Sequence, residues 1–214
     1  VDTMKPEPSG ADAGWKLRAP RRSARTPSGL KTSAVNGSLV FTLTRNGAAD
    51  FGTAVHARFA EVEWLDAGVI EGLAARWAKA DGVDFAAEEA LACLRAPELT
   101  ALWTRPAGRG ETEVWRERAF EMVLDGAWVT GIFDRVTVDR DHAGRAFGAT
   151  VIDFKTDRLA DAAEVVAGLA RHAGQLNLYR RVVAVLTGLA PSQVRCVLVF
   201  TRLRSVETVA AVAD

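Results

Sequence analysis

The hydrophobic periodicity of this chain changes near residue 110, and that change limits the possible folds more than any other feature of the sequence. From about residue 50 to 103, apolar residues recur at steps of three and four, which predicts a block of helices. Beyond residue 112, short apolar runs are separated by Asp125-Gly126 and by a second turn at 141–144, which predicts strands joined as hairpins. We therefore expect a helical block followed by a sheet core over about 112–212.

One long helix interrupts the strands of the sheet core. It is predicted over about 160–187, because Gly188 follows it and Pro191 prevents its continuation. The apolar run at 193–201 predicts a strand in the interior of a sheet, and 205–212 predicts a short edge strand. Helices, then three antiparallel strands, a crossover helix and another strand indicate an α/β fold.

Residues 1–35 lack any hydrophobic periodicity and are rich in Pro, Gly, Ser and Arg. This composition predicts a flexible basic leader or linker, with residues 36–214 as the folded domain. A solvated tail and an arm that contacts DNA both fit this segment. Its clustered basic residues are Lys16, Arg18, Arg21, Arg22 and Arg25.

The composition narrows the possible functions. The formal net charge is zero, so any role with nucleic acid has to depend on local charge and on a specific site. Cys93 and Cys196 are too few for a cysteine-ligated zinc site or an iron–sulfur cluster, and we expect two buried thiols in a reducing compartment. Without a membrane-spanning apolar run or a signal peptide, we expect a cytoplasmic protein that does not contact a membrane.

The segment Asp153-Phe154-Lys155 is the first candidate for a reactive site. Side chains alternate between the faces of a strand, so Asp153 and Lys155 share one face, and Ile152 and Phe154 share the other. A carboxylate and an ammonium placed in this way form a compact pair beside an apolar strand. Taken alone, the same pattern also fits an ion pair on an exposed edge strand.

Asp134 lies on the preceding predicted strand and favours the reactive alternative. An ionised carboxylate on an apolar face is costly unless it is paired or bound to a metal. Asp134 and Asp153 are expected on neighbouring strands, where a divalent cation would relieve their repulsion. Oxygen ligands favour Mg²⁺ or Mn²⁺ over zinc. The face predicted for Asp134 otherwise holds Thr130, Ile132, Val136 and Val138.

Four further side chains are candidates, and each has a structural alternative. Glu117, one strand earlier, is an active-site acid or an ordinary surface glutamate. His56 near the start of a helix is a ligand or a structural histidine. Gln175 and Tyr179, at i and i+4 on the long helix, touch a phosphate backbone, hold the lysine, or simply pack on the sheet. Arginines next to these segments that could contact phosphates are Arg116, Arg118, Arg135 and Arg158.

Five short motifs occur in order along residues 50–201: Gly-Thr-Ala-Val-His (52–56), Arg-Glu-Arg-Ala-Phe (116–120), Gly-Ile-Phe-Asp-Arg-Val (131–136), Val-Ile-Asp-Phe-Lys-Thr-Asp (151–157) and Gln-Leu-Asn-Leu-Tyr (175–179). This series resembles the PD-(D/E)XK nuclease domain of the RecB and AddA type, which forms the C-terminal part of bacterial helicase-nucleases that process double-strand breaks. The resemblance implies a restriction-endonuclease-like core with the order α-β-β-β-α-β, after an N-terminal helical block.

The resemblance also implies roles for individual residues. The metal ligands would be His56, Asp134 and Asp153, with the backbone carbonyl of Ile152 as a further candidate. The catalytic residues would be Asp134, Asp153, Lys155 and Glu117. The residues that contact nucleic acid would be Gln175, Tyr179, Arg116 and Arg135.

The implied activity is that of a Mg²⁺- or Mn²⁺-dependent deoxyribonuclease, with an exonuclease favoured over an endonuclease. Its partners would be DNA and a helicase motor, in the same full-length chain or in a partner subunit, because this chain has no phosphate-binding Gly-x-x-x-x-Gly-Lys-Ser/Thr loop. In the family, an aromatic residue often precedes the glutamine of the last motif by a few positions. This chain departs from that pattern, because it has His172 near that position. A non-catalytic module that binds DNA ends or another protein is the alternative.

Overall fold

The structure is a computed structural model that describes residues 24–25, 47–78, 82–107 and 110–211. It confirms the mixed α/β fold and the α-β-β-β-α-β order of the core. Most of the predicted leader lies outside the described residues. In chain order the elements are β1 (Ala24–Arg25), α1 (Gly47–Ala60), α2 (Val69–Trp77), α3 (Phe85–Arg95), η3 (Pro97–Leu99), α4 (Thr100–Trp103), β2 (Glu111–Leu124), β3 (Ala127–Arg140), β4 (Ala146–Lys155), α5 (Ala162–Thr187), η4 (Pro191–Gln193), β5 (Val194–Phe200) and β6 (Ser205–Val209).

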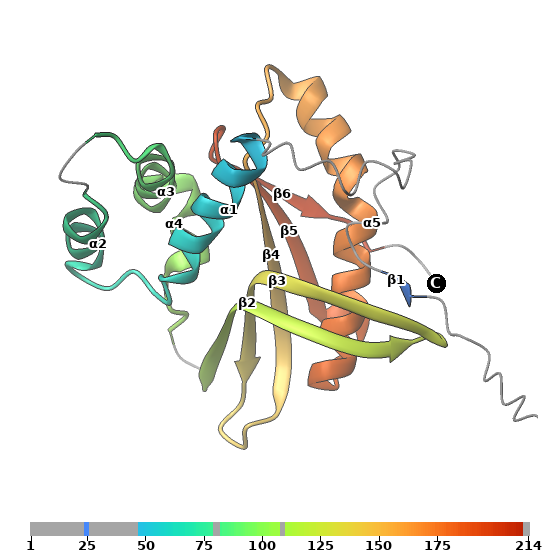
Figure 1. The fold of residues 1–214 in the computed structure, drawn as a ribbon. Helices are drawn as coiled ribbons and strands as arrows, with labels where there is room; N and C mark the ends of the chain where they lie inside the picture. The colour runs from blue at the N-terminus through green and yellow to red at the C-terminus, as the bar shows by residue number, and fades with distance from the viewer. Residues whose placement is uncertain (1–23, 26–46, 79–81, 108–109, 212–214) are drawn as a thin grey trace, which may run out of the picture.

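The strands form one sheet in which β3 has the most neighbours (Figure 1). β2 pairs antiparallel with β3 along its whole length, through a tight turn at Asp125-Gly126 where both residues have positive φ. β4 pairs with β3 antiparallel and with β5 parallel, and β6 pairs antiparallel with β5. The parallel pair requires a crossover, which α5 provides.

The pairing of β3 with β4 covers only the second half of β3. It ends where Arg135 is opposite Ile152, so residues 127–134 of β3 keep β2 as a neighbour but leave β4. We call the part of the β2–β3 hairpin over residues 117–134 the hairpin arm. A fork therefore opens between β3 and β4 at the root of the arm, next to the end of β4.

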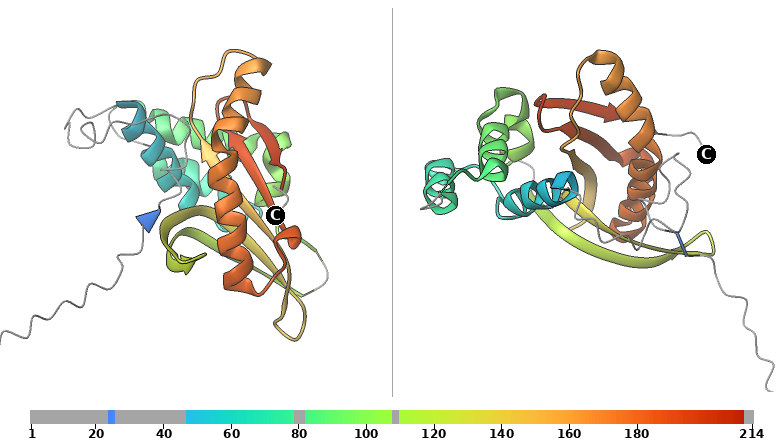
Figure 2. Two further views of the ribbon diagram at one scale, coloured as in Figure 1. Left: turned by 90° about the vertical axis from the view of Figure 1, so that its right-hand side faces the viewer. Right: turned by 45° about the horizontal axis from the view of Figure 1, so that its top comes forward.

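Helices cover both faces of the sheet (Figure 2). α5 packs on one face, where Leu176 and Val183 join Val151 of β4 and Leu198 of β5 in one core. The helical block α1–α4 packs on the other face, against Ile152, Phe154, Val197 and Val199. β4 and β5 are thus buried on both sides, so Asp153-Phe154-Lys155 does not lie on an exposed edge strand.

The capping residues explain the limits of α5. The Asp161 carboxylate accepts a hydrogen bond from the Glu164 backbone N–H at the first turn, and Gly188 ends the helix with a left-handed φ of 74°. No helix among the described residues is both long enough and apolar enough to cross a membrane. Cys93 and Cys196 are free and buried, as expected for two structural thiols.

The predicted apolar face around Asp134 is wrong in one respect. Ile132 is 49% exposed, whereas Val136 and Val138 are fully buried. On β3 the residues that face α5 have odd numbers up to Phe133 and even numbers from Val136 onwards. The alternation changes phase at the fork, so Asp134 stands at the edge of the core and not in the middle of an apolar face.

Arg135, which was expected to contact nucleic acid, lies in the interior, where its side chain is only 1% exposed. Its guanidinium group donates to the carbonyl oxygens of Val62 (2.9 Å) and Glu63 (2.5 Å) and lies over the rings of Trp103 and Trp64. Burial, aided by the nearby charge of another arginine, lowers its pKa to about 10, so it remains a cation at neutral pH. Arg135 joins the sheet to the helical block.

Replacing Arg135 by methionine should lower the free energy of unfolding by about 2–4 kcal/mol, because the two carbonyl groups would lose charged donors inside the protein. Urea denaturation measures the change. Arg118→Met is the matched control, since Arg118 also lies over a tryptophan, Trp115, but is exposed. Its expected cost is below about 1 kcal/mol. Equal losses in the two variants would show that Arg135 does not join the two layers.

Candidate active site

The predicted site residues come from five elements that meet at the fork between β3 and β4. α1 carries His56, β2 carries Glu117, and β3 carries Asp134. Asp153 and Lys155 lie at the end of β4, on the face covered by α5. Because β3 leaves β4 at this point, groups from both faces of the sheet come close to one another.

The backbone of Phe154 contacts two of the predicted site residues on one side of the fork. Its N–H donates to Asp134 Oδ2 at 2.8 Å, and its carbonyl oxygen lies 3.1 Å from His56 Nε2. A carbonyl oxygen only accepts, so His56 Nε2 carries the hydrogen and donates it. The carbonyl group that His56 contacts is that of Phe154, and the Ile152 carbonyl as a further metal ligand stays a prediction.

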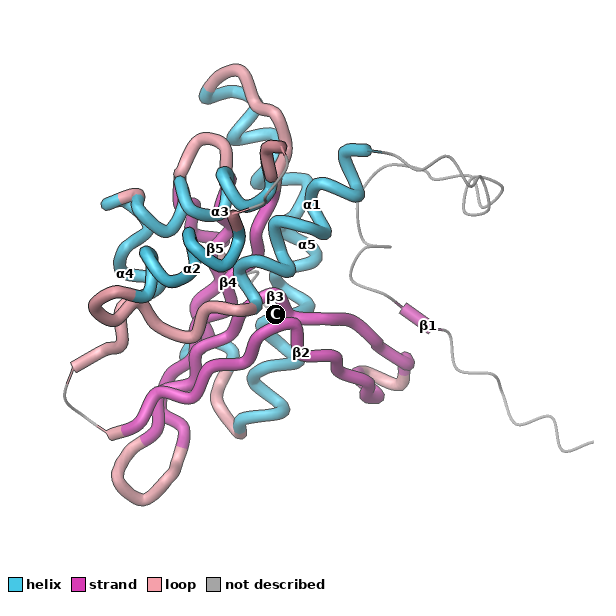
Figure 3. The backbone as a smooth tube through the Cα atoms, turned by 60° about the vertical axis from the view of Figure 1, so that its left-hand side comes forward, coloured by secondary structure: helices cyan, strands magenta, loops and turns pink. Residues whose placement is uncertain are grey.

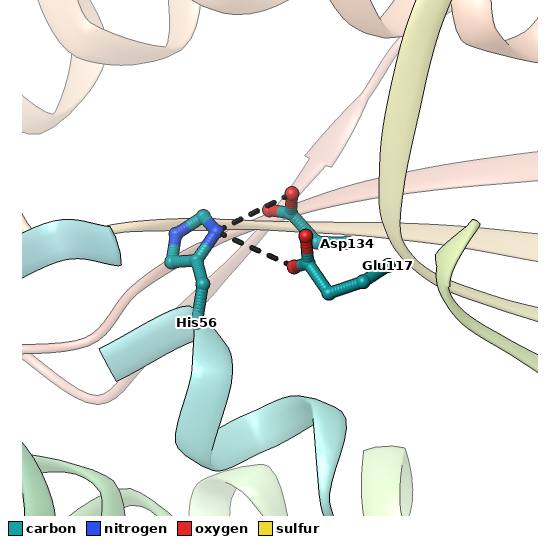
Figure 4. A group of neighbouring side chains, drawn as sticks. All are labelled: His56, Glu117 and Asp134. Atoms are coloured by element: carbon teal, nitrogen blue, oxygen red, sulfur yellow. Dashed lines mark ion pairs between the residues drawn. The ribbon is translucent and has the colours of Figure 1, made fainter. Parts of the chain in front are cut away.

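The other ring nitrogen of His56 faces two carboxylates (Figure 4). Nδ1 lies 3.4 Å from Asp134 Oδ1 and 3.8 Å from Glu117 Oε1. In neutral histidine this nitrogen has a lone pair, so three acceptors point at one another. Either a proton on Nδ1 or a cation between the three atoms relieves this repulsion.

These three side chains fit a divalent cation. The candidate ligand atoms of His56, Glu117 and Asp134 all lie within 4.8 Å of one another. A histidine that ligates a metal usually donates its second N–H to a carbonyl or carboxylate, as His56 does to Phe154. One imidazole nitrogen with two carboxylate oxygens suits Mn²⁺ or Mg²⁺, and the absence of thiolates argues against a structural zinc site.

The pKa values reflect the same crowding of charge. Burial lowers the pKa of His56, but the hydrogen bond and the charge of Asp134 outweigh it, so the pKa is raised above its ordinary value. Burial raises the pKa of Asp134, but the hydrogen bond and charge of His56 outweigh it and hold the pKa low. The pKa of Glu117 is raised, first by burial and then by the charge of Asp134. Asp134 is therefore ionised at neutral pH.

The backbone of Glu117 is unusual. Its φ of 44° is left-handed, a region that glutamate rarely adopts. This residue lies opposite the phase change of β3, between the pairs Arg116–Arg135 and Arg118–Phe133. The left-handed backbone at Glu117 interrupts the regular strand and places the Glu117 carboxylate beside His56. Backbone strain of this kind persists where the surrounding structure enforces it, often at functional sites.

Lys155 and Asp153 form a close ion pair on the opposite side of the fork. Lys155 Nζ lies 2.5 Å from Asp153 Oδ2, and Gln175 Nε2 donates to Asp153 Oδ1 at 3.3 Å. Among the described residues, the group of candidate ligands is His56, Glu117 and Asp134, and the expected role of Asp153 as a further metal ligand stays a prediction. Burial lowers the pKa of Lys155, but the carboxylates of Asp153 and Asp134 outweigh it and raise the pKa, so Lys155 is an ammonium at neutral pH.

Gln175 and Tyr179 lie inside the protein and make contacts within the fork, and the contact with nucleic acid expected of them stays a prediction. Gln175 donates to Asp153 and also lies 3.2 Å from the Tyr179 hydroxyl group. That hydroxyl group donates to the carbonyl oxygen of Ile132 at 2.7 Å. The two residues hold β4 and β3 at a fixed distance, which matches the alternative that they hold the lysine and its partner in place.

Two other predicted or neighbouring residues have clear positions. Arg116 donates to the carbonyl oxygen of Ala60 at 3.0 Å and remains partly exposed, so its contact with DNA stays a prediction. His172 is buried, with Nε2 3.8 Å from Asp157 Oδ2. Sequence reasoning did not identify the Phe154 carbonyl or Asp157. The alternating directions of carbonyl groups along a strand could have suggested the first.

Comparison with known proteins agrees with this geometry. A search of curated proteins found no match. The sequence model of the PD-(D/E)XK nuclease superfamily matches residues 31–213, which include both the helical block and the sheet core. The match covers the acids of the fork and the Asp153-Phe154-Lys155 segment, whose pattern of acid, any residue and lysine is the one in the superfamily's description. Because the match extends over most of the chain, the chain belongs to the PD-(D/E)XK nuclease superfamily.

Proposed function

We propose that this domain is a deoxyribonuclease that hydrolyses phosphodiester bonds with the help of a divalent cation. The observation that carries the proposal is the pair of opposed groups in the fork. His56, Glu117 and Asp134 form a ligand set on one side, and the Lys155 ammonium lies on the other. A scissile phosphate between the two would meet positive charge from both sides.

The ligand set would hold Mg²⁺ or Mn²⁺. Such an ion supplies Lewis acidity, which activates water and stabilises charge on the phosphate. The roles of the protein groups follow from their contacts. Phe154 fixes the tautomer of His56 through its carbonyl oxygen, and Asp134 remains charged at neutral pH. Asp153 keeps Lys155 in position, and Gln175 keeps Asp153 in position.

The finer assignment is a nuclease domain of the RecB and AddA type. The five ordered motifs from His56 to Tyr179 support it. We infer that a helicase motor, in the same full-length chain or in a partner subunit, delivers DNA to this domain during the repair of double-strand breaks. An exonuclease would suit a domain that receives a strand from a motor.

The decisive experiment is cleavage of linear single-stranded and double-stranded DNA with Mg²⁺, with Mn²⁺ and with EDTA. The wild-type protein should cut at least one substrate with metal and none with EDTA. Asp153→Ala should lose most of this activity, because Lys155 would lose its partner at 2.5 Å.

Three results of these experiments would contradict the proposal, and each would favour a different explanation. Equal cleavage by wild type and Asp153→Ala would mean that a contaminating nuclease, and not this site, cuts the DNA. DNA binding without cleavage in any metal would favour a non-catalytic module that binds DNA ends. Failure to bind Mn²⁺ and DNA would point to a protein-interaction module.

A further inference from the structure

His172 is a buried histidine that the proposed reaction does not use. Its side chain is 3% exposed, and neither ring nitrogen makes a hydrogen bond within the part of the protein that the structure describes. Nε2 lies 3.8 Å from Asp157 Oδ2, which allows electrostatic attraction but is too long for a direct hydrogen bond. A buried polar group without a hydrogen bond destabilises a fold. An apolar side chain would cost less in this place, so stability alone does not account for the histidine.

His172 belongs to a row of polar side chains along one face of α5. His172, Gln175 and Tyr179 are spaced three and four residues apart, so they share that face. Gln175 donates to Asp153 of β4, and Tyr179 donates to the backbone of β3. His172 extends the row by one helical turn and faces Asp157, which follows β4. The row therefore contacts both the end of β4 and the residues just after it.

The chain just after Lys155 is the part that His172 contacts. β4 ends at Lys155, and 156–161 connects it to α5 without a helix or a strand, as the pink tube between these elements shows in Figure 3. The Lys155 carbonyl oxygen accepts from the Thr201 N–H at 2.9 Å, which ties the end of the strand to the residue after β5. The contact between His172 and Asp157 ties the connection to α5 as well.

Charge couples His172 to Lys155 through Asp157. His172 holds the pKa of Asp157 below its ordinary value, although burial opposes the shift, so Asp157 is a carboxylate at neutral pH. Burial lowers the pKa of Lys155, but neighbouring carboxylates, including that of Asp157, raise it above its ordinary value. Asp157 is therefore close enough to attract the ammonium group, and a displaced Asp157 would disturb it.

We propose that His172 is a positioning residue for Lys155, which it fixes by holding Asp157 against α5. Gln175 holds the acid on the other side, Asp153, so Lys155 lies between two fixed points. This inference rests on the proposed function and adds a residue to its machinery. Positioning of this kind matters for the rate, because a shift of about 1 Å in a reacting group can slow catalysis by up to about 10²-fold.

The first test compares Mn²⁺-dependent DNA cleavage by wild type, His172→Leu and His172→Gln. At saturating DNA, His172→Leu should cut about ten-fold more slowly, with unchanged KM and Mn²⁺ affinity. Its midpoint of urea unfolding should not fall, because no hydrogen bond is lost. His172→Gln should recover most of the rate, since its amide group replaces the donor that faces Asp157. His142→Leu changes an exposed histidine in the turn at 141–144 and should behave as wild type.

A second comparison asks whether His172 acts through Lys155. In a Lys155→Met background, His172→Leu should cause no further loss of rate. Asp157→Asn should cause the same loss as His172→Leu, alone or combined with it. A further ten-fold loss in the Lys155→Met background would overturn the inference, because His172 would then act independently of Lys155. A fall in stability that accompanies slower cleavage, without recovery in His172→Gln, would also overturn it and make His172 a packing residue.

Acetylation of Lys155 gives a readout that does not need activity. In EDTA, Lys155, whose side chain is 15% exposed, should react with acetic anhydride about two- to five-fold faster in His172→Leu than in wild type, because the segment opens more easily. Mass spectrometry measures the rate against the other lysines of the same sample. An unchanged rate would overturn the inference and leave the nuclease assignment intact. If wild type cuts no DNA in any metal, the proposed function fails, and faster acetylation in His172→Leu would still support His172 as the residue that fixes Lys155.

Discussion

Replacing Asp134 by asparagine should lower the rate of metal-dependent DNA cleavage about 10³-fold or more. Two groups hold Asp134 in its charged form, His56 at 3.4 Å and the Phe154 N–H at 2.8 Å. A bound metal supplies several kcal/mol of transition-state stabilisation, and each 1.36 kcal/mol corresponds to a factor of ten in rate. Asparagine keeps an oxygen that accepts from Phe154, so the fold should remain.

The loss should appear in metal binding as well as in cleavage. Titration calorimetry with Mn²⁺ should show binding to wild type and little or none to Asp134→Asn. Asp139→Asn is a matched control on the same strand, because Asp139 accepts a hydrogen bond from the Thr112 hydroxyl group and is not among the candidate ligands. It should keep both properties. An Asp134→Asn protein that binds Mn²⁺ and cuts DNA at the wild-type rate would refute the site.

The sequence predicted the elements of the core well because their signals are local. Turn residues such as Asp125-Gly126 and the stop at Gly188 act within a few positions of where they stand. The same is true of the alternation that places Asp153 and Lys155 on one face of β4. These two residues are indeed partners, 2.5 Å apart.

The fork between β3 and β4 could not be predicted in this way. The prediction assumed regular alternation along β3, but the phase changes beside Asp134, opposite the left-handed backbone of Glu117. That change turns Arg135 into the core and brings Glu117 to His56. No local pattern marks it, because it depends on how the helical block packs against the sheet. His56 meets Phe154 across 98 positions of sequence, a contact that only the completed fold defines.

The resemblance to a family helped where periodicity failed. It singled out His56 and Glu117, which would otherwise count as a structural histidine and a surface glutamate. For Gln175 and Tyr179 it gave the residues but not their contacts, because a motif records which residues recur and not what they touch. In this protein their polar atoms bond to Asp153 and to the backbone of β3. In this protein, Gln175 and Tyr179 therefore link β4 to β3.

Replacing Lys155 by methionine should lower the rate of cleavage about 10²–10³-fold while leaving Mn²⁺ binding intact. That factor is typical for the loss of one preorganised group that stabilises charge in a transition state. Asp153 and Asp134 raise the pKa of Lys155 above its ordinary value, so the side chain remains an ammonium throughout the neutral range. It acts as a cation, and the rate should fall by the same factor at every neutral pH.

The contrast with Asp134→Asn separates the two sides of the fork. Asp134→Asn should lose metal and activity together, whereas Lys155→Met should lose activity alone. Arg145→Met removes a surface cation, 81% exposed, at the far end of the β3–β4 hairpin and controls for a general loss of positive charge. It should cut DNA normally. A loss in Lys155→Met that grows as the pH rises would mean that the neutral amine acts as a base, and the assignment of Lys155 as a fixed cation would be wrong.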